Sequence, residues 1–442
     1  IVDHLDQGPV VITKGHGARV TDNRGRDYLD AMGGLWCVNI GYGRQEMVDA
    51  ITAQAKEIAY YHLFFSMANE PAIRLADKVL QLVPNHMSKV FFCNSGSEAN
   101  DTQVKIAWYY NNLRGKPEKK KIISRKLGYH GVTVVAASMT GLPRNHQSFN
   151  LPLDGFLHVS PPHHYWYAKN GETEVEFSKR LAEELDALIQ REGPDTVAAF
   201  IAEPVMGAGG VITPPEGYFI EIQNVLKKHD VLFIADEVIC GFGRLGTMFG
   251  TDLYQLEPDM MSIAKGLTSA YVPMSAAIIS EKIWNVLKSG SPDTGPFAHG
   301  YTYGGHPLAA AAGLKTIEIM ERENLVDKAH KIGGYFQRKL RAKFADHPLV
   351  GEVRGVGLIA GIELVANKAE KIPFELSVQI GPQMTQLLLD EGLINRVITN
   401  TIAFSPPLVV TESDIDEMVE RCSRALEKLT DKLVHEGMWK AA

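Results

Sequence analysis

Three kinds of polar residue that could do chemistry each follow an apolar run in the middle of the chain. Glu203 follows the run 196–202, Asp236 and Glu237 follow 231–235, and Lys265 follows 260–264. A lysine that is desolvated at the end of a strand has a lowered pKa, which suits it to Schiff-base chemistry. A carboxylate in such a place needs a cation or hydrogen-bond donors. We therefore expect Glu203, Asp236 and Lys265 to face a common crevice at the carboxyl ends of neighbouring strands.

A candidate phosphate site precedes these residues. The segment 94–100 (NSGSEAN) lies between the apolar run 89–93 and a helical stretch that reaches Tyr110. Small residues at a strand-to-helix turn let backbone N–H groups and serine hydroxyls face a phosphate at the helix N-terminus. In the alternative interpretation, Ser95 or Ser97 only caps the helix. The segment alone does not separate these two interpretations.

A glycine motif at 241–246 (GFGRLG) fits the pattern GxGxxG of dinucleotide-binding proteins. That fingerprint requires the glycines to leave a strand directly and to open a helix. Here residues 236–240 intervene, and the following residues (TMFGTD) have no helical period. The pattern therefore favours a structural turn over a nicotinamide site.

The elements that must position these residues alternate along the chain. Helix-length amphipathic segments such as 176–191 and 218–229 separate several short apolar runs. This alternation predicts a mostly parallel sheet that helices cover on both faces, within an α/β domain of roughly residues 60–310. The seven expected strands are 89–93, 121–124, 132–138, 196–202, 231–235, 260–264 and 274–280.

The two ends of the chain predict a second, smaller α+β domain. The N-terminal 60 residues hold a strand pair at 10–20 and 27–30, which needs a neighbour to bury it, and we expect it to join the C-terminal part. A capped helix is expected to open at 411–416. The other C-terminal expectations are a helical stretch over 306–344, a strand at 351–366, a helix near 377–391 and a strand at 400–404.

Composition excludes several classes of protein. The 442 residues carry a net charge of −7 and 45% hydrophobic residues, which favours neither disorder nor a nucleic-acid partner. No apolar stretch approaches the ~20 residues that span a bilayer, so we expect no membrane association and a cytoplasmic location. The four scattered cysteines are expected to be buried free thiols. No metal site is expected, and His163 and His164 are assigned to a surface loop.

Several short strings together resemble a known family. They are LWCVNIGYG (35–43), NSGSEAN (94–100), GYHG (128–131), EPVMGAGGV (203–211), ADEVICGFGRLG (235–246), AKGL (264–267), YTYGGHP (301–307), RGVGL (354–358) and SPPLVVT (405–411). In this order they are similar to class III aminotransferases of the ω-amino-acid or amine:pyruvate type. The resemblance implies a pyridoxal 5′-phosphate (PLP) enzyme of fold type I. It also implies a large domain at 60–315 and a small domain built from 1–59 and 316–442.

The resemblance implies roles for individual residues. Lys265 and Asp236 are the catalytic residues: Lys265 forms the Schiff base with PLP and moves the proton, and Asp236 pairs with the pyridinium nitrogen. Thr302 is expected to reach the phosphate from the other subunit, which implies an obligate homodimer with shared active sites and leaves dimer versus tetramer open. The full cofactor-binding set is Gly96, Ser97, Tyr129, His130, Glu203, Asp236, Val238, Lys265 and Thr302.

The resemblance also suggests substrate contacts. Arg396 is expected to clamp the carboxylate of a keto acid or an amino acid. Trp36, Phe64 and Phe65 match aromatic pocket positions. Arg144 could add a second anion contact. Met206 stands where many members have glutamine, which puts a polar contact to the cofactor in doubt at that position.

The resemblance implies a ping-pong reaction through aldimine and ketimine intermediates. The amino group would pass from an ω-amino acid or amine to a keto acid such as pyruvate. A PLP-dependent decarboxylase or aminomutase on the same scaffold is the alternative. A nicotinamide oxidoreductase and a non-catalytic PLP-binding relative are further rivals.

Overall fold

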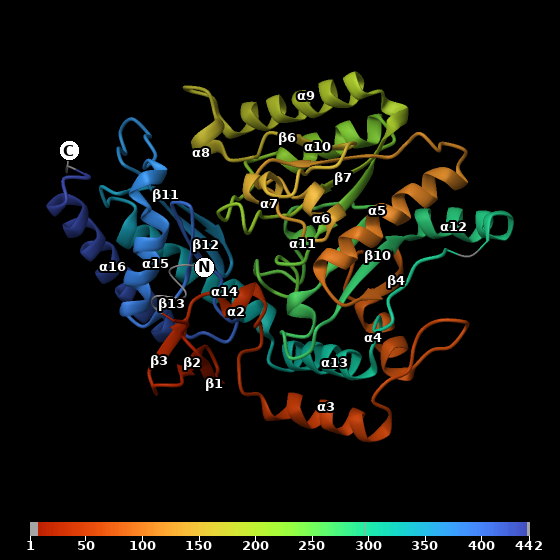
Figure 1. Cartoon of the computed structure of the whole chain (residues 1–442), viewed down its shortest axis with the longest axis horizontal. Coiled ribbons are helices and arrows are strands. Elements are labelled where there is room, and N and C mark those ends of the chain that lie inside the picture. The colour runs from red at the N-terminus through yellow and green to blue at the C-terminus, as the bar shows by residue number, and fades with distance from the viewer. Residues whose placement is uncertain (1–7, 296, 440–442) are drawn as a thin grey trace.

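A seven-stranded sheet forms the centre of the molecule (Figure 1). The structure is a computed structural model that describes residues 8–295 and 297–439. The strand order is β4-β10-β9-β8-β7-β5-β6, and only the pairs that involve β10 are antiparallel. The mostly parallel sheet is therefore confirmed. Its strands are β4 (Met87–Cys93), β5 (Lys121–Arg125), β6 (Phe156–Val159), β7 (Val197–Ala202), β8 (Leu232–Asp236), β9 (Met260–Ile263) and β10 (Ser275–Ser280).

Helices cover both faces of this sheet, and every residue of the interior strand β7 is therefore buried. Phe200 of β7 packs in one core with α9 (Glu174–Glu192) and α10 (Tyr218–Lys228). Ile201, which points the other way, belongs to the core formed with α5 (Gly96–Leu113), α6 (Val134–Met139) and α12 (Glu281–Thr294). Alternate side chains of one strand thus serve two different cores, which explains the continuous apolar run in the sequence.

One of the seven strand predictions is wrong, because the segment forms a helix. Residues 132–138 were expected to form the third strand, but 134–139 form the helix α6. Three valines favour a strand by propensity, yet the buried face of α6 consists of Ala136, Ala137, Ser138 and Met139, and tertiary packing decides between the two structures. The missing strand is β6, which lies at the sheet edge and has a half-buried centre, so it lacks the continuous apolar run used to find the others.

The two ends of the chain meet in smaller sheets. Strand β3 pairs in parallel with β13, so residues near the N-terminus share a sheet with C-terminal residues. The expected strands 10–20 and 351–366 are each two strands joined by a turn. Gly17 in the first turn has a φ of +57°, and Gly357 in the second has a φ of +55°. These strands are β1 (Ile12–His16), β2 (Arg19–Asp22), β3 (Asp27–Asp30), β11 (Val350–Val356), β12 (Ile359–Leu364), β13 (Leu393–Ile394), β14 (Arg396–Ile398) and β15 (Thr401–Phe404).

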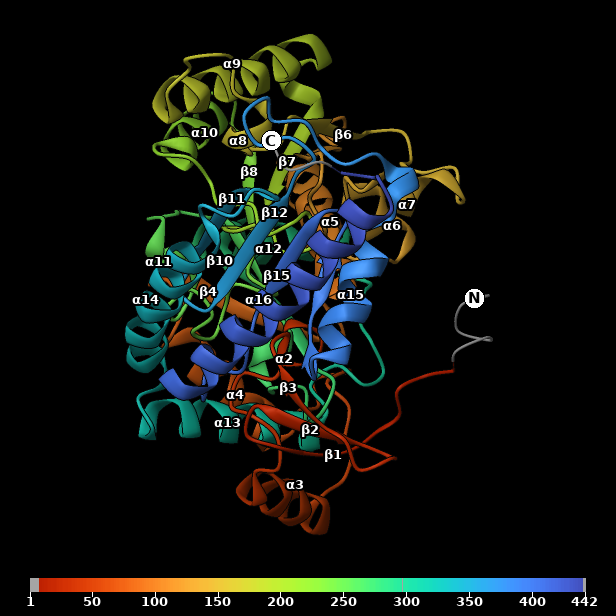
Figure 2. The same cartoon turned by 90° about the vertical axis from the view of Figure 1, so that its left-hand side faces the viewer.

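Long helices complete this part of the molecule. Figure 2 shows α14, α15 and α16 around the β11, β12 and β15 strands. Helix α16 begins with the expected cap, because the Thr411 side chain accepts from the Asp414 N–H and the Asp414 carboxylate accepts from the Thr411 N–H. The bounds are α13 (Pro307–Arg322), α14 (Leu325–Phe344), α15 (Ile380–Asp390) and α16 (Glu412–His435).

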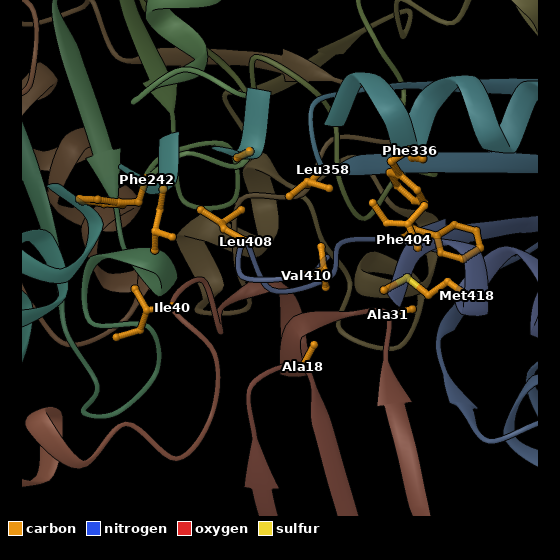
Figure 3. Close-up of a cluster of buried hydrophobic side chains, with 14 of the residues drawn as sticks. Ala18, Ala31, Ile40, Phe242, Phe336, Leu358, Phe404, Leu408, Val410 and Met418 are labelled. Atoms are coloured by element: carbon orange, nitrogen blue, oxygen red, sulfur yellow. The ribbon is translucent and has the colours of Figure 1, made fainter. Parts of the chain in front are cut away.

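One of the apolar cores joins residues from the N-terminal, middle and C-terminal parts of the chain. Figure 3 shows Ala18 and Ala31 in the same cluster as Phe242, Phe404 and Met418. Helices α3 and α4 pack against α13 and extend this contact. The remaining helices are α2 (Gly33–Trp36), α3 (Gln45–Glu57), α4 (Glu70–Leu80), α7 (Pro143–Gln147), α8 (His164–Tyr167) and α11 (Gly250–Leu253), with 3-10 turns at Pro194–Thr196, Lys265–Leu267 and Leu376–Val378.

The glycine motif at 241–246 forms turns rather than opening a helix after β8. Its Arg244 is fully buried and joins distant segments: Nη1 donates to the Leu358 carbonyl (3.0 Å), and Nη2 donates to Oδ1 of Asn39 (3.2 Å). The motif therefore has a structural role in which its arginine ties three parts of the chain together.

Candidate active site at the carboxyl edge of the sheet

A cavity of about 610 Å³ lies at the carboxyl ends of the central strands. Glu203 follows β7, Asp236 ends β8 and Lys265 follows β9. These three strands are neighbours and run parallel, so their carboxyl ends meet at one edge. All three side chains line the cavity, as their positions in the sequence predict.

Lys265 is half-buried in this cavity and lies on a 3-10 turn. Its φ of +43° is in the left-handed region, which a lysine rarely adopts. Burial lowers the pKa of its amine, and the nearby Asp236 and Glu203 partly oppose that shift. The result is a lysine with more free amine near neutral pH than an exposed one, and free amine is the nucleophilic form.

Asp236 accepts hydrogen bonds at both carboxylate oxygens. Oδ1 accepts from the Val238 N–H (3.1 Å), and Oδ2 accepts from Nδ2 of Asn100 (2.8 Å) and Nδ1 of His130 (2.8 Å). These donors stabilise a buried negative charge. Asn100 was not among the expected site residues. Its signal is a polar side chain three residues after Ser97, which places the two on one face of α5.

The turn before α5 combines both interpretations of the NSGSEAN segment. Ser95 caps the helix, because its side chain accepts from the Glu98 N–H (3.2 Å). Gly96 and Ser97 line the cavity, and Oγ of Ser97 accepts from the Val132 N–H (3.1 Å). A side chain at position 96 would press on Val238 at about 3.0 Å. A capped 18-residue helix therefore presents its N-terminus and a serine hydroxyl to the cavity.

Glu203 is buried beside the cavity and is held by backbone donors. Oε1 accepts from the Tyr129 N–H (3.0 Å), and Oε2 accepts from the Gly207 N–H (2.9 Å). Burial raises the pKa of its carboxyl group. Tyr129 and Val238 both line the cavity. Glu203 thus fixes the backbone that carries the Tyr129 ring.

Not every expected residue lies at this cavity. Arg396 begins β14 and lines it, and so does Trp36, which is only 2% exposed. Among the residues that the structure describes, the cavity lining does not include Thr302, Phe64 or Phe65. Phe65 is 89% exposed and Thr302 is exposed, so neither side chain lies in the cavity of its own chain.

Two further expected residues also lie away from the lining. Arg144 is on α7 and Met206 is fully buried next to its bridge partner Ile212. Met206 is therefore a core residue in this chain. Cys37 departs from the expected burial, because it is half-buried in the cavity wall, whereas the other three cysteines are buried.

The assignment of His163 and His164 to a surface loop is wrong. His163 is 5% exposed and its Nε2 lies 3.2 Å from Oε2 of Glu352, and His164 begins α8. The aromatic residues that follow these two histidines favour an irregular loop. In the structure, His163 instead lies in the contact between β11 and α8. Within residues 8–295 and 297–439, no group of His, Cys, Asp or Glu side chains could hold a metal ion. No helix in those ranges is both long and apolar enough to cross a membrane.

Comparison with known proteins decides the family. The model of the class III aminotransferase family matches residues 2–426. This chain belongs to the class III aminotransferases. The enzyme is 49% identical to diaminobutyrate–2-oxoglutarate transaminase of Halomonas elongata, over 99% of this chain and 94% of that protein. It is 48% identical to the mitochondrial gamma aminobutyrate transaminase 1 of Solanum lycopersicum, over 98% of this chain and 84% of that protein.

Solved structures agree with the fold of this aminotransferase. The omega transaminase of Pseudomonas jessenii, solved in complex with PMP, superposes with a TM-score of 0.95 at 47% identity. The match covers 97% of this chain and 95% of that one. A transaminase from a study of directed evolution by ancestral reconstruction gives 0.96 at 51% identity, over 97% and 94% of the two chains. Fold type I is therefore confirmed, and the enzyme uses PLP to transfer amino groups.

The described side chains fit this cofactor. A phosphate suits the capped N-terminus of α5 with the Ser97 hydroxyl, and an aromatic ring nitrogen suits the Asp236 carboxylate. An aldehyde suits the amine of Lys265. The space for the phosphate depends on glycine, because a Cβ at position 131 would lie 2.4 Å from Oγ of Ser97.

Proposed function

We propose that this enzyme transfers the amino group of an ω-amino acid or an amine to a monocarboxylic keto acid such as pyruvate. The observation that carries the proposal is that Lys265 shares the cavity with one arginine, Arg396, among the described lining residues. A keto acid with one carboxylate needs one such clamp, whereas a second carboxylate would call for another cation. An exposed arginine side chain that begins a short strand can also move aside for an amine that has no carboxylate.

The proposed division of labour follows from the placement of the residues. Bound PLP supplies an electron sink for the reacting carbon. Lys265 Nζ would take the proton from the substrate Cα and return it to C4′ of the cofactor. Asp236 would hold the proton of the ring nitrogen, and Gly96 and Ser97 would hold the phosphate.

The cavity walls position the rings of cofactor and substrate. Tyr129 and Val238 line the cavity and would pack against the cofactor ring, and Glu203 supports the Tyr129 backbone through the 3.0 Å hydrogen bond. His130 contacts the ring indirectly through Asp236. Trp36 forms an apolar wall for the donor side chain. With the cofactor bound, these contacts would orient the substrate Cα towards Lys265.

Arg396→Ala is expected to raise the KM for pyruvate about 10- to 100-fold, because a charge-assisted clamp on the carboxylate is lost. Steady-state kinetics with 1-phenylethylamine and pyruvate measure this value, and a rapid-mixing experiment isolates the amine half-reaction. That half-reaction should keep its rate. The matched control is Arg144→Ala, an arginine on α7 outside the cavity lining, which should leave both values unchanged. Equal losses in both half-reactions for Arg396→Ala would contradict the clamp.

The rate at which PLP-free protein captures PLP is expected to rise with pH and to level off below the range of an ordinary lysine. Only the free amine attacks the aldehyde, and burial lowers the pKa of Lys265, so its free form dominates at a lower pH than the usual ~10.4. Absorbance after mixing measures the rate across a pH series. A rate that still climbs steeply near pH 10 would show that Lys265 titrates like a solvated lysine.

We also propose that two copies of the chain complete each other's sites. Exposed aromatic and apolar residues lie in the segment 60–67 and next to Thr302, and the two segments meet where Tyr60 donates from its hydroxyl to the Thr302 carbonyl (2.7 Å). Exposed apolar residues that gather in this way are typical of protein interfaces. The group consists of Tyr60, Tyr61, Leu63, Phe65, Met67 and Tyr303. A dimer would bury it and would give Thr302, Phe64 and Phe65 a place at the partner's cavity.

The domain boundaries and the cellular location complete the proposal. We place the large domain at 60–315 and the small domain at 1–59 and 316–442, which the pairing of β3 with β13 supports. We place the enzyme in the cytoplasm, which the four free cysteines support, because reducing compartments keep thiols unpaired.

A further inference from the structure

Asn100 lies one turn into α5 and lines the cavity, where its side-chain amide makes two contacts. It is 1% exposed. Its Nδ2 donates to Oδ2 of Asp236 (2.8 Å) and to the backbone carbonyl of His130 (2.7 Å). Asn100 therefore ties together the acid and the loop that carries the Tyr129 and His130 side chains.

The chemistry of the contacts fixes how these groups are oriented. Both partners of the Asn100 amide are acceptors, so the nitrogen must face them; the opposite orientation would bring oxygen against two oxygens. The Nδ1 of His130 faces a carboxylate and must carry the hydrogen. Its Nε2 is buried without a partner among the described residues.

Consequently the two oxygens of Asp236 are not equivalent. Oδ2 accepts from two side-chain donors and is saturated. Oδ1 accepts only from the Val238 N–H, at 3.1 Å, and keeps one acceptor position open. Because Oδ2 is saturated, the carboxylate is held against turning, and a further hydrogen bond would be accepted by Oδ1.

We propose that Asn100 is a positioning residue for the cofactor ring, which holds Asp236 so that Oδ1 is the acceptor for the proton of the ring nitrogen. The inference rests on the role proposed above for Asp236 and adds a residue that acts through it. Asn100 also couples this role to the Tyr129 wall, since the same nitrogen fixes the His130 carbonyl next to Tyr129. A purely structural asparagine would stabilise α5 without affecting how tightly the cofactor is held.

The chain offers a matched control one turn later on the same helix. Gln103 is also fully buried, and its Nε2 donates to the Met261 carbonyl (2.7 Å), but it does not line the cavity. Asn100→Leu and Gln103→Leu each remove one buried amide that donates to a backbone carbonyl. Only the first also removes a donor to Asp236.

The test is equilibrium dialysis of each holoenzyme variant against a series of PLP concentrations, together with a pH titration of the cofactor absorbance and the thermal unfolding midpoint. Asn100→Leu is expected to weaken PLP binding about 10- to 100-fold and to shift the absorbance titration. Gln103→Leu should lower the unfolding midpoint by about as much as Asn100→Leu does, and it should keep wild-type PLP affinity. Wild-type affinity and absorbance in Asn100→Leu, or an equal loss of affinity in Gln103→Leu, would overturn the inference.

Two more variants separate the inference from the role of Asp236. Asn100→Asp sets a second carboxyl group against Oδ2, so PLP should bind weakly at neutral pH and recover in acid, where the protonated group again donates a hydrogen bond. No recovery in acid counts against the inference. Asp236→Asn tests the underlying assignment. If Asp236→Asn loses PLP and Asn100→Leu does not, only the inference fails; if Asp236→Asn changes nothing, the assignment of Asp236 fails.

Discussion

Replacing Lys265 by alanine is expected to lower the rate of amino transfer by about 10²- to 10⁴-fold, the range that a positioned acid–base group supplies. Lys265 is the only lysine among the residues described as lining the cavity. Its loss removes the base for the substrate Cα and the amine that captures the aldehyde. Turnover of 1-phenylethylamine with pyruvate, followed as alanine formed, measures the effect.

Borohydride reduction provides the control for this prediction. Reduction of the holoenzyme should attach the cofactor to Lys265 alone, as peptide mapping would show. Lys119 is a stringent comparison, because burial lowers the pKa of its amine as well, yet its Nζ donates to the carbonyls of Pro194 and His229 (3.2 and 3.1 Å) away from the cavity. Attachment to Lys119, or substantial turnover by Lys265→Ala, would contradict the assignment.

Replacing Asp236 by asparagine is expected to lower kcat by about 10²- to 10³-fold, as the loss of one preorganised electrostatic partner does in other enzymes. The substitution keeps the size of the side chain and removes the negative charge that holds a proton on the ring nitrogen. The holoenzyme should also release PLP more readily. Steady-state kinetics and cofactor retention on gel filtration measure the two effects.

The neighbouring carboxylate gives a matched control. Glu237 is fully buried but turns away from the cavity, where it accepts from the Gly250 N–H (3.0 Å) and from Thr251. Burial raises the pKa of its carboxyl group to about 7. Glu237→Gln should lower the free energy of unfolding by about 1–3 kcal/mol and leave kcat within about twofold. If Glu237→Gln lost as much activity as Asp236→Asn, the loss would reflect a disturbed fold.

Much of the site could be predicted because it lies at the ends of buried parallel strands. Glu203, Asp236 and Lys265 each end a continuous apolar run, and parallel neighbours must bring such ends together. The phosphate turn carries a helix-capping pattern that is local in the sequence. These features depend on a few adjacent residues, so they can be found without knowledge of the tertiary structure.

The features that were missed depend on contacts between distant segments. Asn100 looks like an ordinary polar position on α5 until β8 brings Asp236 within 2.8 Å of it. Helix α6 was mistaken for a strand, because its valines favour strands and only packing against α5 and β6 makes the helix the better structure. Likewise, the turn at Gly357 splits one expected strand into β11 and β12. The glycine itself is visible in the sequence, but the pairing of β12 with β15 joins segments that are far apart in the chain.

We expect the nitrogen of an amine or ω-amino acid to reach a monocarboxylic keto acid through this site. The most direct measurement incubates the holoenzyme with pyruvate and ¹⁵N-labelled 1-phenylethylamine, β-alanine or γ-aminobutyrate, and follows the label by mass spectrometry. We predict labelled alanine and the matching ketone or aldehyde in equal amounts, with a much slower reaction when 2-oxoglutarate replaces pyruvate. Release of carbon dioxide without labelled alanine, or faster transfer to 2-oxoglutarate than to pyruvate, would contradict the account.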